Sequence, residues 1–351
     1  MYLLPLGSTM YLPPLGIDPH VHLRGEEYPD DYRALALRDA KAVGLRLLIE
    51  QPNCVPQLTS PVVLEQRALM VPRCQRYAGI TNNLSEVRKI LQLVQQKRYG
   101  LVGDKIFYVH STGDMGVTDH SMQKALWELK AELGYTGISV GHFEDEDEFR
   151  IPFDPECPIS HSLRRDPMSE YVQVERQLRF ATNAGFRGTF YVAHVSNPAT
   201  VDLVRSLRHY PFHVVLEVTW HHLFLNTDDY QIHGNRVKVN PPLRSPAIQQ
   251  LLLHQALSAK IDLIGSDHAP HPLARKDDLT TSASGLPALP FYPRGIQLLC
   301  EAGMSGMLLD RMLFHRACSL FGWHYPLVRI EPHYQPQLWE SYGFNPFSRL
   351  G

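Results

Sequence analysis

Short apolar runs alternate with segments of helical spacing along most of the chain. Residues Asp30–Val43 carry apolar side chains at helical spacing, and the apolar run Leu45–Ile49 that follows them predicts a strand. The same order of elements recurs along the sequence. We therefore predict eight strands, at 15–23, Leu45–Ile49, Arg76–Ile80, Lys105–Val109, Gly137–Phe143, Gly188–Val195, Phe212–Trp220 and Ile261–Gly265.

Helices are predicted after these strands. Gly44 stops the first helix, and Ser85 is expected to cap the third. The predicted helices are Asp30–Val43, Ser60–Met70, 84–97, Ser121–Leu133, Ser169–Ala184, Ala199–His209, Ala247–Ser258 and Leu308–Leu320.

This alternation predicts an α/β fold with a parallel sheet, because parallel neighbours need a crossover connection. Eight strand–helix units in about 250 residues are typical of a (β/α)8 barrel. An open doubly wound sheet is the rival, but no Gly-rich phosphate turn follows the first strand. We predict a barrel over residues 1–325. Residues 326–351, rich in proline and aromatic residues, are expected to form an appendage packed on it.

Composition narrows the class of protein. The 351 residues are 44% hydrophobic and 20% charged, with a formal net charge of −2, which argues against a nucleic-acid partner. No apolar run approaches the ~18 residues that cross a bilayer, and the proline-broken N-terminus does not read as a signal peptide. The 5 cysteines are scattered without a CxxC pair, which favours a reducing compartment. We expect a cytoplasmic protein.

Ligand-type side chains gather at the predicted strand ends. His20 and His22 lie two apart in GIDPHVHLR, so a strand would send both to one side. One such histidine is more often structural, and His-x-His alone is weak evidence. The C-terminal ends of barrel strands meet at one mouth, where imidazole and carboxylate groups together favour a metal site. The residues at these ends are His20, His22, Asn53, Lys105, His142, His194, His222 and Asp267.

These motifs resemble those of the dihydroorotase family, metal-dependent (β/α)8 barrels of the amidohydrolase superfamily. The resemblance covers roughly residues 15–325, with the motifs in the family's order. HxH and a late DHAPH occur in many cyclic amidohydrolases, whereas Arg24, Asn53 and KVNPPLR point more narrowly to dihydroorotase. The motifs are DPHVHLR, QPN, DKIFYVHSTGDMGVTD, VGHFED, YVAHVS, LEVTWHHL, KVNPPLR and GSDHAPH.

The resemblance implies a centre of two zinc ions. His20, His22 and Asp267 would bind one ion, and His142 and His194 the other. Lys105 aligns with a lysine that many members carry as a bridging carbamate; an aspartate bridges in some members, and Asp114 and Asp119 follow Lys105 in the sequence.

The resemblance also implies the reaction. Members interconvert N-carbamoyl-L-aspartate and L-dihydroorotate in pyrimidine synthesis. Asp267 would move the proton between water and the ring nitrogen. Arg24 is suited to bind the substrate carboxylate, and Asn53 and His271 resemble its partners in the family.

Other residues are weaker candidates. Ser111 and Thr112 lie in a loop that would close over substrate, and Asn240 and Arg244 would shape the mouth. His221, His222 and His268 are interpreted as structural or as orienting a ligand. The first loop reads HLRGEEYPDD where the family has HLR-(E/D)-PG, and the chain lacks the long flanking segments that build a β-sandwich in larger relatives.

Two alternatives stay open. The first is another cyclic amidohydrolase of the allantoinase or dihydropyrimidinase type, although Arg24 argues against a substrate without a carboxylate. The second is a catalytically silent scaffold for a partner such as aspartate transcarbamoylase, although every ligand position is filled. The partners expected are a small-molecule substrate and no nucleic acid or membrane. A homodimer and an association with the transcarbamoylase are left open.

Overall fold

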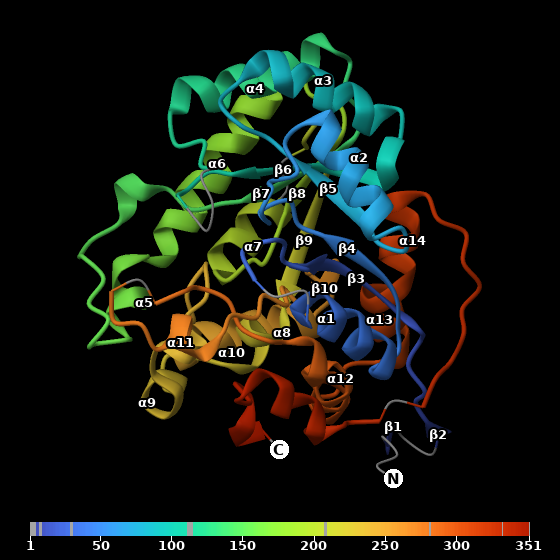
Figure 1. Ribbon diagram of the computed structural model, residues 1–351, viewed down its shortest axis with the longest axis vertical. Coiled ribbons are helices and arrows are strands. Elements are labelled where there is room, and N and C mark those ends of the chain that lie inside the picture. The colour runs from blue at the N-terminus through green and yellow to red at the C-terminus, as the bar shows by residue number, and fades with distance from the viewer. Residues whose placement is uncertain are drawn as a thin grey trace.

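The computed structural model describes residues 5–6, 9–28, 31–110, 115–206, 209–280, 282–331 and 333–350. Its centre is a sheet of 8 strands in sequence order, every neighbouring pair parallel (Figure 1). The strands are Gly16–Val21 (β3), Leu45–Glu50 (β4), Gln75–Gly79 (β5), Leu101–Phe107 (β6), Ile138–His142 (β7), Thr189–Val192 (β8), His213–Thr219 (β9) and Leu263–Gly265 (β10).

The sheet nearly closes on itself between β3 and β10. Val21 forms a parallel bridge with His268, and the His22 backbone N–H donates to the His268 carbonyl at 2.8 Å. β3, β7 and β8 are buried along their whole length, as expected for strands covered on both faces. The predicted (β/α)8 barrel is confirmed.

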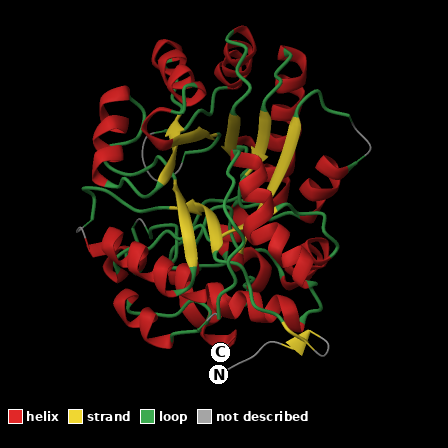
Figure 2. Cartoon of the chain, turned by 90° about the vertical axis from the view of Figure 1, so that its right-hand side faces the viewer, coloured by secondary structure: helices red, strands yellow, loops and turns green. Residues whose placement is uncertain are grey.

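Helices surround the strands (Figure 2). Several start with a polar cap followed by proline, whose fixed φ suits a first helical turn: Ser60 caps α2 and Asn197 caps α7. The longer helices are Asp31–Ala42 (α1), Pro61–Met70 (α2), Leu84–Gln95 (α3), His120–Glu132 (α4), Pro167–Ala184 (α6), Pro198–Arg205 (α7), Pro246–Leu257 (α10) and Tyr292–Glu301 (α12).

Shorter helices fill the connections. No helix in the part of the chain that the structure describes is long and apolar enough to cross a bilayer. The short helices are Ser160–Arg164 (α5), Trp220–Phe224 (α8), Asp229–His233 (α9), Leu273–Lys276 (α11), Gly306–Asp310 (α13) and Arg316–Phe321 (α14).

The structure corrects three details. Asn83, not Ser85, caps α3, because its side-chain oxygen accepts the backbone N–H groups of Ser85 and Glu86 at 3.1 and 3.3 Å. β6 begins at Leu101, four residues before the predicted start, so Lys105 lies within the strand. The predicted helix Leu308–Leu320 is built from α13, a π-helical segment at Arg311–His315 and α14.

The C-terminal segment packs on the barrel core through aromatic side chains. Trp339, Tyr342 and Phe347 are buried in the same hydrophobic cluster as the strands, and the Phe347 ring stacks on Phe291 with centroids 3.8 Å apart. The Tyr342 hydroxyl donates to Asp39 of α1 at 2.7 Å. The segment therefore covers apolar surface that would otherwise face water, while the domain boundary at residue 326 stays a prediction.

Candidate active site

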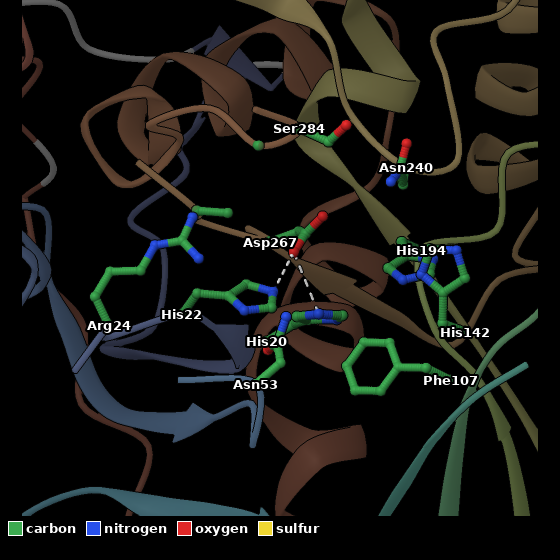
Figure 3. Close-up of a pocket in the computed structure, with 12 residues that line it drawn as sticks. His20, His22, Arg24, Asn53, Phe107, His142, His194, Asn240, Asp267 and Ser284 are labelled. Atoms are coloured by element: carbon green, nitrogen blue, oxygen red, sulfur yellow. Dashed lines mark hydrogen bonds and ion pairs between the residues drawn. The ribbon is translucent and has the colours of Figure 1, made fainter. Parts of the chain in front are cut away.

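A pocket lies at the C-terminal ends of the barrel strands (Figure 3). This is the end of the barrel at which enzymes of this fold place their active sites. The pocket therefore lies where the sequence predicts the ligand-type residues to converge. Its lining consists of His20, His22, Arg24, Asn53, Phe107, His142, His194, Asn240, Asp267, Ala269, Ser284 and Gly285.

His20, His22 and Asp267 form a compact group at the seam between β3 and β10. One Asp267 carboxylate oxygen, Oδ1, lies 3.2 Å from His20 Nε2 and 2.9 Å from His22 Nε2 (Figure 3). Their ligand atoms all lie within 4.8 Å of one another. Two imidazoles and a carboxylate directed at one point are a suitable donor set for a divalent metal.

Glu217 of β9 holds His20 from behind. Its Oε1 accepts from His20 Nδ1 at 2.8 Å, and its Oε2 accepts the Tyr191 hydroxyl at 2.6 Å. This hydrogen bond favours the proton on Nδ1, which leaves the lone pair of Nε2 available to bind a metal. The sequence analysis missed Glu217, although it is the single charged residue in the apolar run FHVVLEVTW.

His142 and His194 form a second histidine pair beside the first group. Their ring centroids lie 4.6 Å apart, and the His194 ring lies 5.2 Å from that of His20. His142 Nε2 donates to Glu144 at 2.7 Å, and Arg165 binds both oxygens of Glu144. Among the described residues, His194 Nδ1 has no hydrogen-bond partner.

Burial favours the neutral form of three imidazoles at the pocket, those of His22, His142 and His194. Burial lowers the pKa of His22 to about 4 and holds the pKa values of His142 and His194 below their ordinary value. A neutral imidazole keeps a lone pair for a ligand bond. Asp267 is ionised, because His20 and His22 outweigh the effect of burial and hold its pKa below the usual range.

Lys105 is directed into the barrel beneath these groups. The side chain of its neighbour Asp104 projects from the other face of β6 and forms an ion pair with Lys130 of α4 at 2.6 Å. Lys105 is fully buried, and Nζ has no hydrogen-bond partner among the residues described. Burial lowers its pKa to about 8. Lys105 does not line the pocket, and Phe107 lies beside it with its ring centroid 5.3 Å from Nζ.

The predicted alternatives to Lys105 have different outcomes. Asp119 caps α4, and its carboxylate accepts the Met122 backbone N–H at 2.7 Å. This capping hydrogen bond gives Asp119 a structural role in α4. Asp114 lies outside the described residues, and so do Ser111 and Thr112, which were predicted for a different role, in a loop that closes over substrate.

Arg24 places a buried positive charge on the pocket wall. Its Nε donates to the Pro270 carbonyl at 3.0 Å, and Nη2 lies 2.9 Å from His271 Nε2. In the described part of the chain no carboxylate lies within ion-pairing distance of this guanidinium. A buried cation without an acidic partner favours an anionic ligand. Asn53 lines the same pocket, and its Oδ1 is buried without a described partner, whereas His271 lies behind Arg24.

Three residues at the site have strained backbone conformations. Arg24, His194 and Asp267 have φ angles of 62°, 39° and 46°, in the left-handed region that L-residues rarely adopt. Such conformations persist where the surrounding structure enforces them, and they gather at functional sites. Here they follow directly from the sharp turns by which the strands deliver side chains to the pocket.

The remaining predicted residues divide between pocket and support. Asn240 lines the pocket and accepts from His161 at 2.9 Å, while Arg244 donates to Ser196 at 3.0 Å and supports a loop. His268 Nδ1 accepts the backbone N–H groups of Ala288 and Leu289. His222 contacts Thr219 and Pro241 at 2.8 and 3.0 Å, and both nitrogens of its neighbour His221 lack described partners.

Solved structures share the architecture of this chain. L-Hydantoinase (dihydropyrimidinase) from Arthrobacter aurescens is 23% identical with a TM-score of 0.72, covering 88% of this chain and 71% of the other. Dihydroorotase from Saccharomyces cerevisiae, solved in complex with 5-fluoroorotic acid, is 16% identical with a TM-score of 0.72, covering 90% and 86%. The fold is that of the TIM-barrel amidohydrolases.

Sequence relatives define the family. The dihydroorotase of Methanothermobacter thermautotrophicus is 30% identical over 320 residues, 87% of this chain and 69% of the relative. That of Halobacterium salinarum is 31% identical over 278 residues, 78% of this chain. The chain belongs to the dihydroorotase family. The matched part covers 63% of the Halobacterium protein and 62% of a Methanosarcina mazei relative, less than two thirds of either. No family profile matches the chain.

Proposed function

We propose that the protein is a zinc-dependent dihydroorotase, which interconverts N-carbamoyl-L-aspartate and L-dihydroorotate in pyrimidine synthesis. One observation carries the proposal: Arg24, which is buried and has no carboxylate partner among the described residues, lines the same pocket as the group His20–His22–Asp267. A cation beside metal-type ligands suits a cyclic amide that also bears a carboxylate. The family and the fold of the dihydroorotase structure support the same substrate.

The donor set of the pocket fits zinc. His20, His22 and Asp267 would hold one ion, and His142 with His194 a second, because the two groups are adjacent and burial lowers the pKa values of His22, His142 and His194. When bound, zinc supplies a Lewis acid and lowers the pKa of a coordinated water toward neutrality. Glu217 and Glu144 hold His20 and His142 in fixed orientations, as expected for groups that support metal ligands.

Lys105 fits the role of a carboxylated bridging ligand. Its Nζ is buried without a hydrogen-bond partner among the described residues, and with a pKa of about 8 it is more readily deprotonated than an ordinary lysine. A neutral Nζ forms an N–C bond to carbon dioxide and releases one proton. The product is a carbamate anion with two oxygens, which replaces a buried cation that would repel a metal.

Replacing Lys105 by methionine tests this role. We expect the zinc content after dialysis to fall from about two ions per chain to about one, because the bridge is lost. The ¹³C NMR signal of a carbamate formed from labelled bicarbonate is expected to disappear. Lys124→Met, an exposed change on α4, is the matched control. Unchanged zinc content together with a persisting carbamate signal would refute the assignment.

Asp267 is placed to carry the proton of the reaction. As an ionised carboxylate it can accept the proton of the water that attacks the ring carbonyl, and then deliver it to the departing ring nitrogen. Arg24 holds the substrate carboxylate, and Asn53 presents a further polar group from the same wall. In the cyclising direction the same groups remove water from N-carbamoyl-L-aspartate.

A substrate comparison tests the proposed function. L-Dihydroorotate, hydantoin and dihydrouracil share a cyclic amide, but only dihydroorotate carries a carboxylate. We expect kcat/KM for L-dihydroorotate to exceed the values for hydantoin and dihydrouracil by at least about 100-fold. A substrate without a carboxylate would leave the buried Arg24 guanidinium unpaired. Equal or better hydrolysis of hydantoin or dihydrouracil would assign a different cyclic amidohydrolase. Zinc binding without hydrolysis of any of them would favour a scaffold.

A further inference from the structure

The first loop after Arg24 is held firmly against the loop that follows β4. The Glu26 backbone N–H donates to the Val55 carbonyl at 2.7 Å, and the Val55 N–H donates to the Glu27 carboxylate at 2.9 Å. A Cβ on Gly25 would lie 2.0 Å from the Val55 carbonyl oxygen, so glycine is needed for this approach. The Tyr28 N–H closes the turn on the Gly25 carbonyl at 3.2 Å.

This turn places Tyr28 behind the positively charged wall of the pocket. The Tyr28 hydroxyl lies 2.5 Å from His271 Nδ1, and the two rings meet edge to face with centroids 5.6 Å apart. The Arg24 guanidinium lies 5.7 Å from the centre of the Tyr28 ring. Tyr28 does not line the pocket, so any effect on substrate passes through Arg24 and His271.

His271 faces two neighbours with opposite requirements. Its Nε2 lies 2.9 Å from Arg24 Nη2, which can only donate, and 2.8 Å from the Ser284 carbonyl, which can only accept. Burial keeps the pKa of His271 well below its ordinary value, so the ring is neutral and carries a single N–H. With the proton on Nε2, the ring donates to the Ser284 carbonyl but cannot accept from Arg24. With the proton on Nδ1, Nε2 accepts from Arg24 but cannot donate to Ser284.

A hydroxyl resolves this conflict at the other ring nitrogen. Tyr28 donates to Nδ1 when Nδ1 is bare and accepts from Nδ1 when it is protonated, because a phenol can do both. Phenylalanine would do neither. The hydroxyl of Tyr28 thus keeps His271 satisfied whichever way Arg24 directs its N–H group.

We propose that Tyr28 is a positioning residue for recognition of the substrate carboxylate, because it supports both tautomers of His271. Without substrate, Arg24 donates to Nε2 and Nδ1–H donates to Tyr28. When a carboxylate binds, Arg24 directs its N–H group to it. Nδ1 releases its proton to solvent water and Nε2 takes up one proton from solvent water, so no proton is gained or lost overall. Nε2–H then donates to Ser284, Tyr28 donates to Nδ1, and the ring stays neutral. The inference rests on the proposed function.

Tyr28→Phe tests the proposal, with Tyr32→Phe as the control, since Tyr32 is the adjacent phenol 5.5 Å from the Tyr28 ring. In Tyr28→Phe we expect KM for L-dihydroorotate and Kd for orotate, measured by calorimetry, to rise by about 10-fold, the effect of leaving one buried polar group unpaired. We expect kcat to stay within about twofold, because Asp267 is untouched. Binding of hydantoin, which has no carboxylate, should not change.

Four outcomes separate this inference from the proposed function. A rise in KM and Kd confined to the carboxylate ligands in Tyr28→Phe supports it. An active wild type with an unaffected Tyr28→Phe overturns it and leaves the proposed function standing. An inactive wild type that binds orotate, more weakly after Tyr28→Phe, supports the inference and overturns the function. An inactive wild type that does not bind orotate overturns both.

Discussion

Asp267→Asn should lower kcat for L-dihydroorotate by about 10³-fold or more while most of the zinc stays bound. The amide keeps the size and one ligand-type oxygen of the carboxylate, which lies 2.9 and 3.2 Å from the imidazoles of His22 and His20. It cannot accept the proton of the attacking water. Loss of a positioned acid–base group costs about 10²–10⁴-fold, and Asp267 would serve in both proton transfers. Steady-state kinetics and metal analysis of the same preparation measure the two effects.

Asp277→Asn is the matched control, because Asp277 is half exposed and pairs with Arg236 away from the pocket. It should retain wild-type kcat and metal content. Near-normal turnover in Asp267→Asn would rule out the proton-transfer role. If turnover falls only in proportion to the zinc that is lost, Asp267 acts as a metal ligand and not as a proton-transfer group.

Arg24→Met is expected to lower kcat/KM for L-dihydroorotate by about 10²–10³-fold, the cost of removing one partner from a buried, hydrogen-bonded charge pair. Methionine fills much of the space of the arginine stem, and the change removes a buried cation that has no carboxylate partner among the described residues. The fold is therefore expected to be preserved. Hydrolysis of hydantoin should change by less than about threefold, so the ratio of the two substrates reports the carboxylate contact directly.

The control for Arg24 is Arg275→Met. Arg275 is an exposed cation whose guanidinium lies 5.8 Å from the centre of the Tyr28 ring. It does not line the pocket. Its removal should leave the substrate ratio unchanged. If Arg24→Met lowers hydrolysis of dihydroorotate and hydantoin by the same factor, the residue supports the site as a whole and does not select a carboxylate.

The sequence predicts the barrel from local patterns, and it predicts the group His20–His22–Asp267 through the resemblance of its motifs to the dihydroorotase family. Strand–helix alternation defines the topology, and the topology brings the strand ends to one mouth. The start of β6 was missed because Gly103 and Asp104 interrupt the apolar run. Asp104 is tolerated in the core because it pairs with Lys130, 26 residues later, and accepts a hydrogen bond from the Ser139 hydroxyl.

Contacts between distant residues explain the rest of what the sequence did not predict. Glu217 meets His20 across 197 residues, and Tyr28 meets His271 across 243. Neither pair has a local signature, because each depends on the closing of the barrel at the β3–β10 seam. The prediction of the α3 cap was wrong for a more local reason. Asn83 and Ser85 are both good cap residues, and only the backbone turn selects between them.

Turnover of L-dihydroorotate by the zinc-loaded protein tests the central claim most directly, followed as the loss of ultraviolet absorbance when the ring opens. We expect measurable hydrolysis, its loss after a chelator removes the metal, and its return when zinc is added back. Hydrolysis that persists in fully metal-free protein would contradict the metal centre built on His20, His22 and Asp267. Absence of hydrolysis in a preparation that holds about two zinc ions per chain would contradict the assignment of dihydroorotate as the substrate.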